Sequence, residues 1–118
     1  MKNYEEMSDS QIAQKVFFFV SGSLCPKGGL AHISSDGFFF FDDKNIKRKF
    51  DPCNNPADAW PIIDENNITI INDHPSMRLA VNDAAGYYNG FSGIIASFDE
   101  NGFRAAMIVF LKMNEDKL

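Results

Sequence analysis

Hydrophobic residues near the N-terminus recur at intervals of three and four residues. Over residues 8–20 this spacing predicts a helix with one apolar stripe and one polar face. Ser8, with Gln11 three residues later, forms a capping box that satisfies backbone donors at a helix start. Ser21-Gly22 marks the expected end of the helix. The apolar stripe consists of Ile12, Val16 and Phe19.

Three consecutive phenylalanines, residues 17–19, lie within this helix. Side chains that follow one another on a helix point in different directions, so these three rings cannot all face one core. At least one of them should cover a second surface, in another layer of the fold or in another subunit. This is the feature of the sequence that points to a homo-oligomer.

Residues 21–50 predict a loop followed by short β-strands. Residues 21–36 are rich in Gly and predict a loop, with a short strand at 30–34. Residues 38–41 are a continuous run of Phe between carboxylates, which predicts a strand buried on both faces. Residues 46–50 alternate between apolar and basic side chains and predict an amphipathic strand, joined to the Phe strand by a hairpin turn at 42–45.

The stretch FDPCNNPADAWPII, residues 50–63, contains the only Trp and three of the five Pro. Asn55 is the expected N-cap of a helix, accepting a hydrogen bond from the backbone N–H of Asp58. Pro56 then falls at the first helical position, where no N–H is needed. The carboxylate of Asp58 would lie beside the positive end of the helix dipole.

Pro61 lies inside this helix and predicts a kink or a short 3₁₀ start. Helical spacing puts Trp60 on the same face as Ala57 and Ile63, so we expect the indole to pack against the sheet. Stacking of Trp60 on a ligand is the alternative. Asn66-Asn67 is the expected left-handed stop.

The second half of the chain predicts three more strands and a last helix. Residues 68–71 and 77–81 are β-branched or alternating runs that should pair as a hairpin, and residues 94–98 should form the third strand. Residues 82–93 predict a Gly- and Asn-rich loop that carries exposed aromatic side chains. Residues 103–114 predict a helix that is apolar on most sides and is the main partner of the sheet.

These elements predict an α+β fold, with a small, mainly antiparallel sheet of about four to six short strands packed by about three helices. A chain of 118 residues can bury about two thirds of its unfolded surface without disulfides or metals. We therefore expect a single globular domain over residues 1–118.

Charge and composition restrict the kinds of partner and the compartment that we expect. The net charge of −5 and the pI near 4.8 argue against a duplex-binding surface, because neutralising phosphates needs clustered cations. Nucleic acid is therefore not an expected partner. The only basic cluster, Lys47-Arg48-Lys49, is expected on a solvated strand or turn. The acidic start is unlike a signal peptide, and no apolar run approaches the ~20 residues of a membrane span. We expect a cytoplasmic protein, in the host cell if phage-encoded, with free thiols.

The sequence predicts no cofactor, no metal site and no catalytic residues. The carboxylates of Asp64 and Glu65 point to different faces of a helix, so they do not form an acid–base pair. The Cys and His residues lack the short spacing of a zinc site. These are Cys25, His32, Cys53 and His74.

A helix start with a guanidinium and a stacking aromatic ring suits an anionic, nucleotide-like ligand. The sequence offers such groups at the Asn55 helix start, on the predicted loop and as two isolated arginines. The candidate ligand-binding residues are Asn54, Asn55, Asp58, Trp60, Arg78, Tyr87, Tyr88 and Arg104.

Two segments carry a family resemblance: FDPCNNPADAWPII at residues 50–63 and RAAMIVFL at residues 104–111. Together they resemble the NinX-like family of phage and prophage proteins, whose function is unknown and whose genes lie among phage accessory genes. The resemblance covers residues 50–118, with a weaker echo in the N-terminal helix. It implies a phage accessory protein and no catalytic residues. Asn101-Gly102-Phe103 departs from the Asn-Pro-Leu helix start of the family.

Three functions follow as hypotheses. The first is a non-catalytic protein that sequesters a small anionic nucleotide-like ligand or metabolite, to counter a host pathway. The second is a protein-interaction module that binds a host protein through exposed aromatic side chains. The third is a small hydrolase with Asp58 as its base, although the absence of a catalytic set favours a protein that is not an enzyme.

Overall fold

The computed structural model describes residues 3–24, 31–72 and 75–115, apart from the side chains of residues 22–24. The chain divides into two compact units, Met1–Asp51 and Pro52–Leu118, which we call the N-unit and the C-unit. Each is described by itself. The expectation of one globular domain over residues 1–118 stays a prediction.

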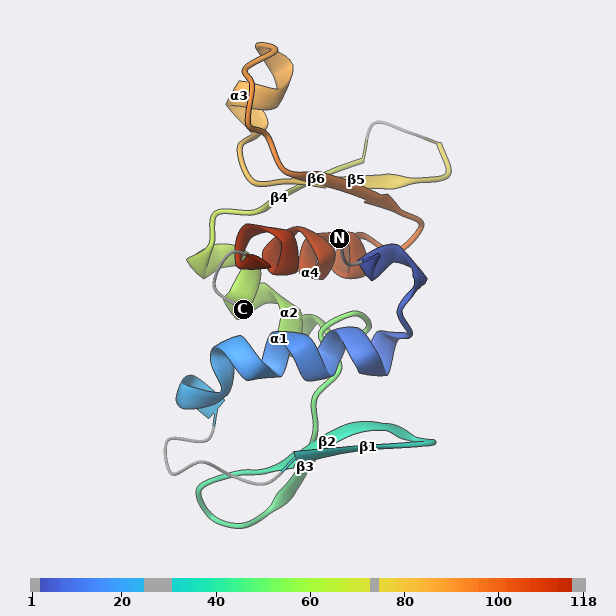
Figure 1. Cartoon of the computed structure of the whole chain (residues 1–118), viewed down its shortest axis with the longest axis vertical. Helices are drawn as coiled ribbons and strands as arrows, with labels where there is room; N and C mark the ends of the chain where they lie inside the picture. The colour runs from blue at the N-terminus through green and yellow to red at the C-terminus, as the bar shows by residue number, and fades with distance from the viewer. Residues whose placement is uncertain (1–2, 25–30, 73–74, 116–118) are drawn as a thin grey trace. The chain divides into compact units, whose positions relative to one another are not determined.

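The described part of the N-unit contains one 3₁₀ turn, one α-helix and one antiparallel sheet in the order β1-β2-β3 (Figure 1). Helix α1 packs against β1 and β2. The elements are η1 (Tyr4–Glu6), α1 (Asp9–Leu24), β1 (Ala31–Ser34), β2 (Gly37–Phe41) and β3 (Lys47–Lys49).

The described part of the C-unit contains three helices and a second antiparallel sheet in the order β4-β5-β6. Helix α4 packs against all three strands and against α2. The elements are α2 (Pro56–Glu65), β4 (Thr69–Ile71), β5 (Arg78–Val81), α3 (Ala84–Tyr88), β6 (Ala96–Asp99) and α4 (Gly102–Met113). The predicted α+β class is confirmed. The six described strands form two sheets of three, and the α-helices number four.

The capping box at the start of α1 is present. The Gln11 N–H donates to Ser8 Oγ at 3.1 Å, and the Ser8 N–H donates to Gln11 Oε1 at 2.9 Å. The expected end at Ser21-Gly22 is wrong, because the helix continues to Leu24. A single glycine costs a helix only about 1 kcal/mol and does not stop it.

The core of the N-unit is built from phenylalanine rings. Phe17 contacts the rings of Phe38, Phe40 and Phe50 at centroid distances of 5.2, 5.1 and 5.8 Å. Phe17 is therefore the buried member of the Phe triplet, whereas Phe18 is 68% exposed. The prediction that Phe19 lies on the buried stripe of this helix is wrong, because Phe19 is half-buried.

Strand β2 is buried on one face only, which corrects the expectation that both faces are buried. Phe38 and Phe40 are buried, whereas Phe39 and Phe41 are half-buried on the opposite face. The reason is the small size of the sheet, because α1 packs on only one side of it.

The β2–β3 turn is held by one carboxylate. Asp42 accepts from the backbone N–H groups of Lys44 and Ile46, each at 2.9 Å, and pairs with the Arg48 guanidinium. The Arg48 hydrogen bond, followed by that of the Ile46 N–H, lowers the pKa of Asp42 below its ordinary value. Asn45 takes the left-handed position, with φ of 61°. The predicted hairpin is confirmed.

Helix α2 has the predicted cap and the predicted stop. The Asn55 side chain accepts from the N–H of Ala57 at 3.0 Å, one residue earlier than expected. The helix runs as α-helix through Pro61, so the short 3₁₀ start, one of the two predicted alternatives, is wrong, whereas the kink stays a prediction. Asn67 has φ of 56°, and the N–H of Ile68 donates to the carbonyl of Ile63 at 3.0 Å.

Asn67 gives a test of this stop. Replacing Asn67 with Ala should lower the free energy of unfolding by about 1 kcal/mol, because a side chain with a Cβ and no local hydrogen bond resists the left-handed conformation. Asn67→Gly, the matched control, should cost less than half as much. Urea unfolding of the two variants measures the difference, and equal stability would contradict the assignment.

Candidate functional site

The starts of α2 and α4 are joined by one side chain. Asn101, the N-cap of α4, accepts from the N–H groups of Phe103 and Arg104 at 2.9 and 3.3 Å. Its amide nitrogen donates to the Cys53 carbonyl and, at 3.3 Å, to Asn54 Oδ1. Because Cys53 and Asn54 immediately precede the α2 cap, the two helix starts lie side by side.

The two arginines differ in environment. Arg104 Nε donates to Asp99 Oδ2 at 3.0 Å, and both side chains are largely buried. The expectation of an isolated guanidinium is therefore wrong for Arg104, whose charge is matched by Asp99. Arg78 lies opposite Asp99 in the strand register, half-buried. An added Cβ on Gly102 would lie 3.6 Å from the Arg78 side chain, so Arg78 also belongs to the start of α4.

Trp60 is on the outside of the C-unit. Its indole is 47% exposed and packs edge-on against Phe103, with centroids 5.6 Å apart. The expectation that Trp60 packs against the sheet is wrong, because α4 lies between α2 and the strands (Figure 1). The indole therefore covers the start of α4 and leaves part of its surface to solvent.

The predicted loop at residues 82–93 contains a short helix, α3. Asp83 caps it by accepting from the N–H of Gly86 at 2.9 Å. Tyr87 and Tyr88 lie on this helix, 39% and 62% exposed, with ring centroids 5.4 Å apart. The sequence does contain a feature that predicts this helix: Asp83, a residue type favoured at N-caps, stands directly before Ala84-Ala85.

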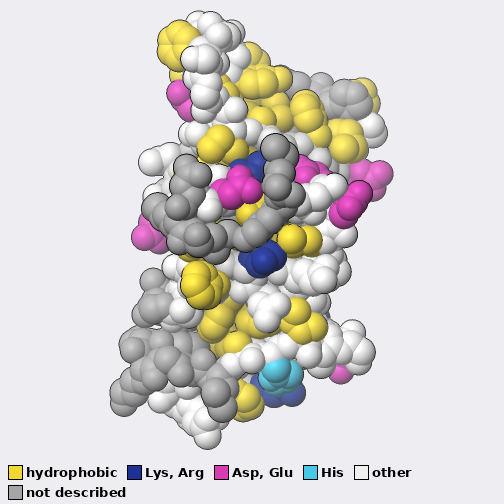
Figure 2. Space-filling view, viewed as in Figure 1, with side chains coloured by type: hydrophobic (Ala, Val, Ile, Leu, Met, Phe, Trp, Pro, Cys, Tyr) yellow, Lys and Arg dark blue, Asp and Glu magenta, His cyan; other side chains and the backbone are white. Residues whose placement is uncertain are grey.

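The face of the β4–β6 sheet opposite α4 is apolar. Ile71, Leu79 and Val81 form a buried cluster there, with Ala84, Ile94 and Ala96 packed against it. Phe98 pairs with Leu79 across the strands and is 53% exposed. The cluster runs along the sheet to the first residue of α3, and Phe98 is an exposed ring beside it. Figure 2 shows hydrophobic side chains gathered over these elements.

The structure therefore separates the predicted site residues into two groups. Asn54, Asn55, Asp58, Trp60, Arg78 and Arg104 lie at or beside the starts of α2 and α4. Tyr87 and Tyr88 lie beyond the opposite end of β5, since that strand begins at Arg78 and leads from Val81 into α3. Sequence reasoning missed Asn101, Phe103 and Phe98, whose roles come from contacts distant in the chain.

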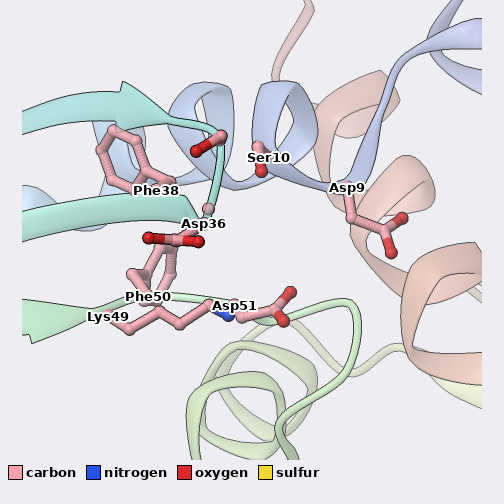
Figure 3. A pocket seen from close by; sticks show the side chains of 9 residues that line it. Asp9, Ser10, Asp36, Phe38, Lys49, Phe50 and Asp51 are labelled. Atoms are coloured by element: carbon pink, nitrogen blue, oxygen red, sulfur yellow. The ribbon is translucent and has the colours of Figure 1, made fainter.

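A cavity of about 130 Å³ lies within the N-unit, and none of the predicted site residues lines it. Figure 3 shows its polar rim, where three carboxylates and one ammonium group surround a floor of buried Phe rings. Within the described ranges, no three His, Cys, Asp or Glu side chains are grouped to hold a metal ion. Cys25 and His74 lie outside those ranges. The lining side chains include Asp9, Ser10, Asp36, Phe38, Lys49, Phe50 and Asp51.

None of the helices in the described part of the chain is long and apolar enough to cross a membrane. The model of the family described as Bacteriophage P22, NinX matches residues 3–114. The chain belongs to the phage P22 NinX family. Membership confirms the resemblance carried by residues 50–63 and 104–111 and extends it through the N-unit, which supports a phage accessory protein. No curated protein sequence matches the chain.

Two variants of Asn101 separate the capping of α4 by its side-chain oxygen from the bridge that its amide nitrogen makes to Cys53 and Asn54. Asn101→Ser keeps an oxygen that can cap α4 but removes the donor to Cys53 and Asn54, whereas Asn101→Ala removes both. We expect Asn101→Ala to be the less stable variant by about 1 kcal/mol, the value of a helix cap. Chemical denaturation provides the comparison. If the serine variant were as unstable as the alanine variant, the capping role would be refuted.

Proposed function

We propose that this NinX family member is a non-catalytic binding protein that engages a host protein through Phe98 and the exposed aromatic side chains in and directly after α3. The observation that carries the proposal is the exposure of four aromatic side chains on this part of the C-unit. Tyr and Phe are enriched in the cores of protein interfaces. The four are Tyr87, Tyr88, Phe91 and Phe98, each at least 39% exposed.

Charge indicates the kind of partner. Residues 52–118 contain nine Asp or Glu against four Lys or Arg, so the C-unit carries the whole net charge of −5. Complementary charge speeds encounter and excludes wrong partners. A host protein with a basic contact surface around an apolar centre therefore fits this unit best.

A pull-down from host lysate tests this function. The purified chain should retain a host protein in stoichiometric amount, and the double variant Tyr87→Ser, Tyr88→Ser should retain at least tenfold less, because a few central aromatic residues carry most interface energy. Phe18→Ser is the matched control, since it removes a ring that is 68% exposed in the N-unit. Equal retention by all three proteins, or no partner, would count against the proposal.

Sequestration of a small anionic ligand is the second candidate. The half-exposed Trp60 beside two joined helix starts favours it, since backbone N–H groups and an indole face can hold a nucleotide. The pairing of Arg104 with Asp99 and the carboxylate of Asp58 weaken it. The hydrolase alternative rests only on the position of Asp58 in the first turn of α2.

Mass spectrometry of small molecules released from the purified protein tests the ligand candidate, together with thermal shifts on a nucleotide panel. We expect a bound compound to raise the melting temperature of the wild-type chain and to lose this effect in Trp60→Ala. The Phe18→Ser variant should respond like the wild type. If no compound were released and no nucleotide shifted the melting temperature, the second candidate would be rejected.

A further inference from the structure

The basic cluster Lys47-Arg48-Lys49 forms strand β3 and lies beside the phenylalanines of β2. Lys47 pairs with Phe41 and Lys49 pairs with Phe39, so both lysines share a face with these rings. His32 of β1 pairs with Phe39 from the other side. Since α1 packs through Phe17 on Phe38 and Phe40, these groups lie on the sheet face away from α1.

Aromatic rings and cations are interleaved on this face. The His32 ring stacks on Phe39 at 24° with centroids 5.9 Å apart, and Lys47 Nζ lies 4.6 Å from the centroid of the same ring. His32, Lys47 and Lys49 are all exposed. In Figure 2 the histidine and Lys/Arg colours meet over this sheet. The exposed imidazole of His32 and the half-buried ring of Phe39 therefore lie beside the lysines of β3.

The net charge of the chain does not argue against an anionic partner here. Residues 1–51 contain seven Lys or Arg and seven Asp or Glu, so the N-unit is formally neutral. Among the nearby carboxylates, Asp42 is committed to Arg48. Asp9, Asp36 and Asp51 line the cavity that Lys49 also lines, whereas Lys47 is not among its lining residues.

We propose that this face of the β1–β3 sheet binds single-stranded nucleic acid. A base would stack on His32, supported from behind by Phe39, while Lys47 and Lys49 neutralise adjacent phosphates. Single strands present their bases for such stacking, whereas a duplex keeps them inside and needs more cations than two lysines supply. Exposed rings with flanking cations on an open sheet are the chemistry that recognises single strands regardless of sequence.

Fluorescence anisotropy with labelled oligonucleotides tests the proposal on the full chain. The probes are a 15-nucleotide oligo(dT), a 15-nucleotide oligo(U) and a 15-base-pair duplex, at about 50 mM salt. At least one single strand should bind more tightly than the duplex, and the tighter of the two identifies DNA or RNA as the source. Two phosphate contacts predict that raising the salt to about 200 mM weakens binding about sevenfold.

The variants separate stacking from charge. His32→Ala should weaken single-strand binding at least about fivefold, the effect of losing one base–aromatic stack. Lys47→Ala should weaken it and reduce the salt dependence by about half. Lys15→Ala removes the same charge from α1 and is the matched control, with circular dichroism as the check on folding. Equal binding of the duplex, equal loss in Lys15→Ala and His32→Ala, or no binding at low salt would each overturn the proposal.

Discussion

Burial of α4 is the interaction on which the C-unit depends. Seven consecutive residues, Ala105 to Leu111, are each at most 4% exposed. A helix that is apolar on nearly every side must be covered on more than one side. Strands β4, β5 and β6 cover one side and α2 another. Burial of these apolar side chains away from water is the main contribution that holds the elements of the C-unit together.

Covering α4 in this way decides which side chains remain outside. The sheet offers one face to the helix; on its second face Leu79 and Val81 are buried by their neighbours, and Phe98 is 53% exposed. Helix α2 lies on α4 rather than on the sheet, so the Trp60 indole packs against the ring of Phe103 and stays 47% exposed. The N-unit is arranged in the same way, because α1 packs against one face of β2 and Phe39 lies on the other face. In both units, then, one helix covers one face of a three-stranded sheet, and an aromatic side chain, Phe98 or Phe39, lies on the other face.

Local signals in the sequence predicted the local structure well. The Ser8 capping box, the Asn55 cap with Pro56, and the Asn67 stop each depend on residues within one turn, and each is present. Alternation and β-branching located the strands for a similar reason, because the period of side chains along a strand is fixed by the backbone. The buried last helix was evident from its composition alone.

Local patterns in the sequence could not predict whether a large apolar side chain is buried or exposed. Trp60 and Phe39 were expected to be buried because both are large and apolar, but their exposure depends on which elements pack beside them. The bridge from Asn101 to Asn54 spans 47 residues, and no local pattern records it. Asp99 and Arg104, five residues apart, meet because β6 leads directly into α4. The candidate site was therefore predicted as a set of residue types, and its division into two groups came from tertiary contacts.

Fluorescence of the only tryptophan tests this account most directly. If α4 fills the core and forces the indole outward, the native protein should emit near the wavelength of a partly solvated indole, acrylamide should quench it readily, and unfolding in urea should shift the emission little. A blue-shifted native emission that resists acrylamide and moves strongly on unfolding would contradict the claim that α4 fills the core of the C-unit and leaves the Trp60 indole on its outside.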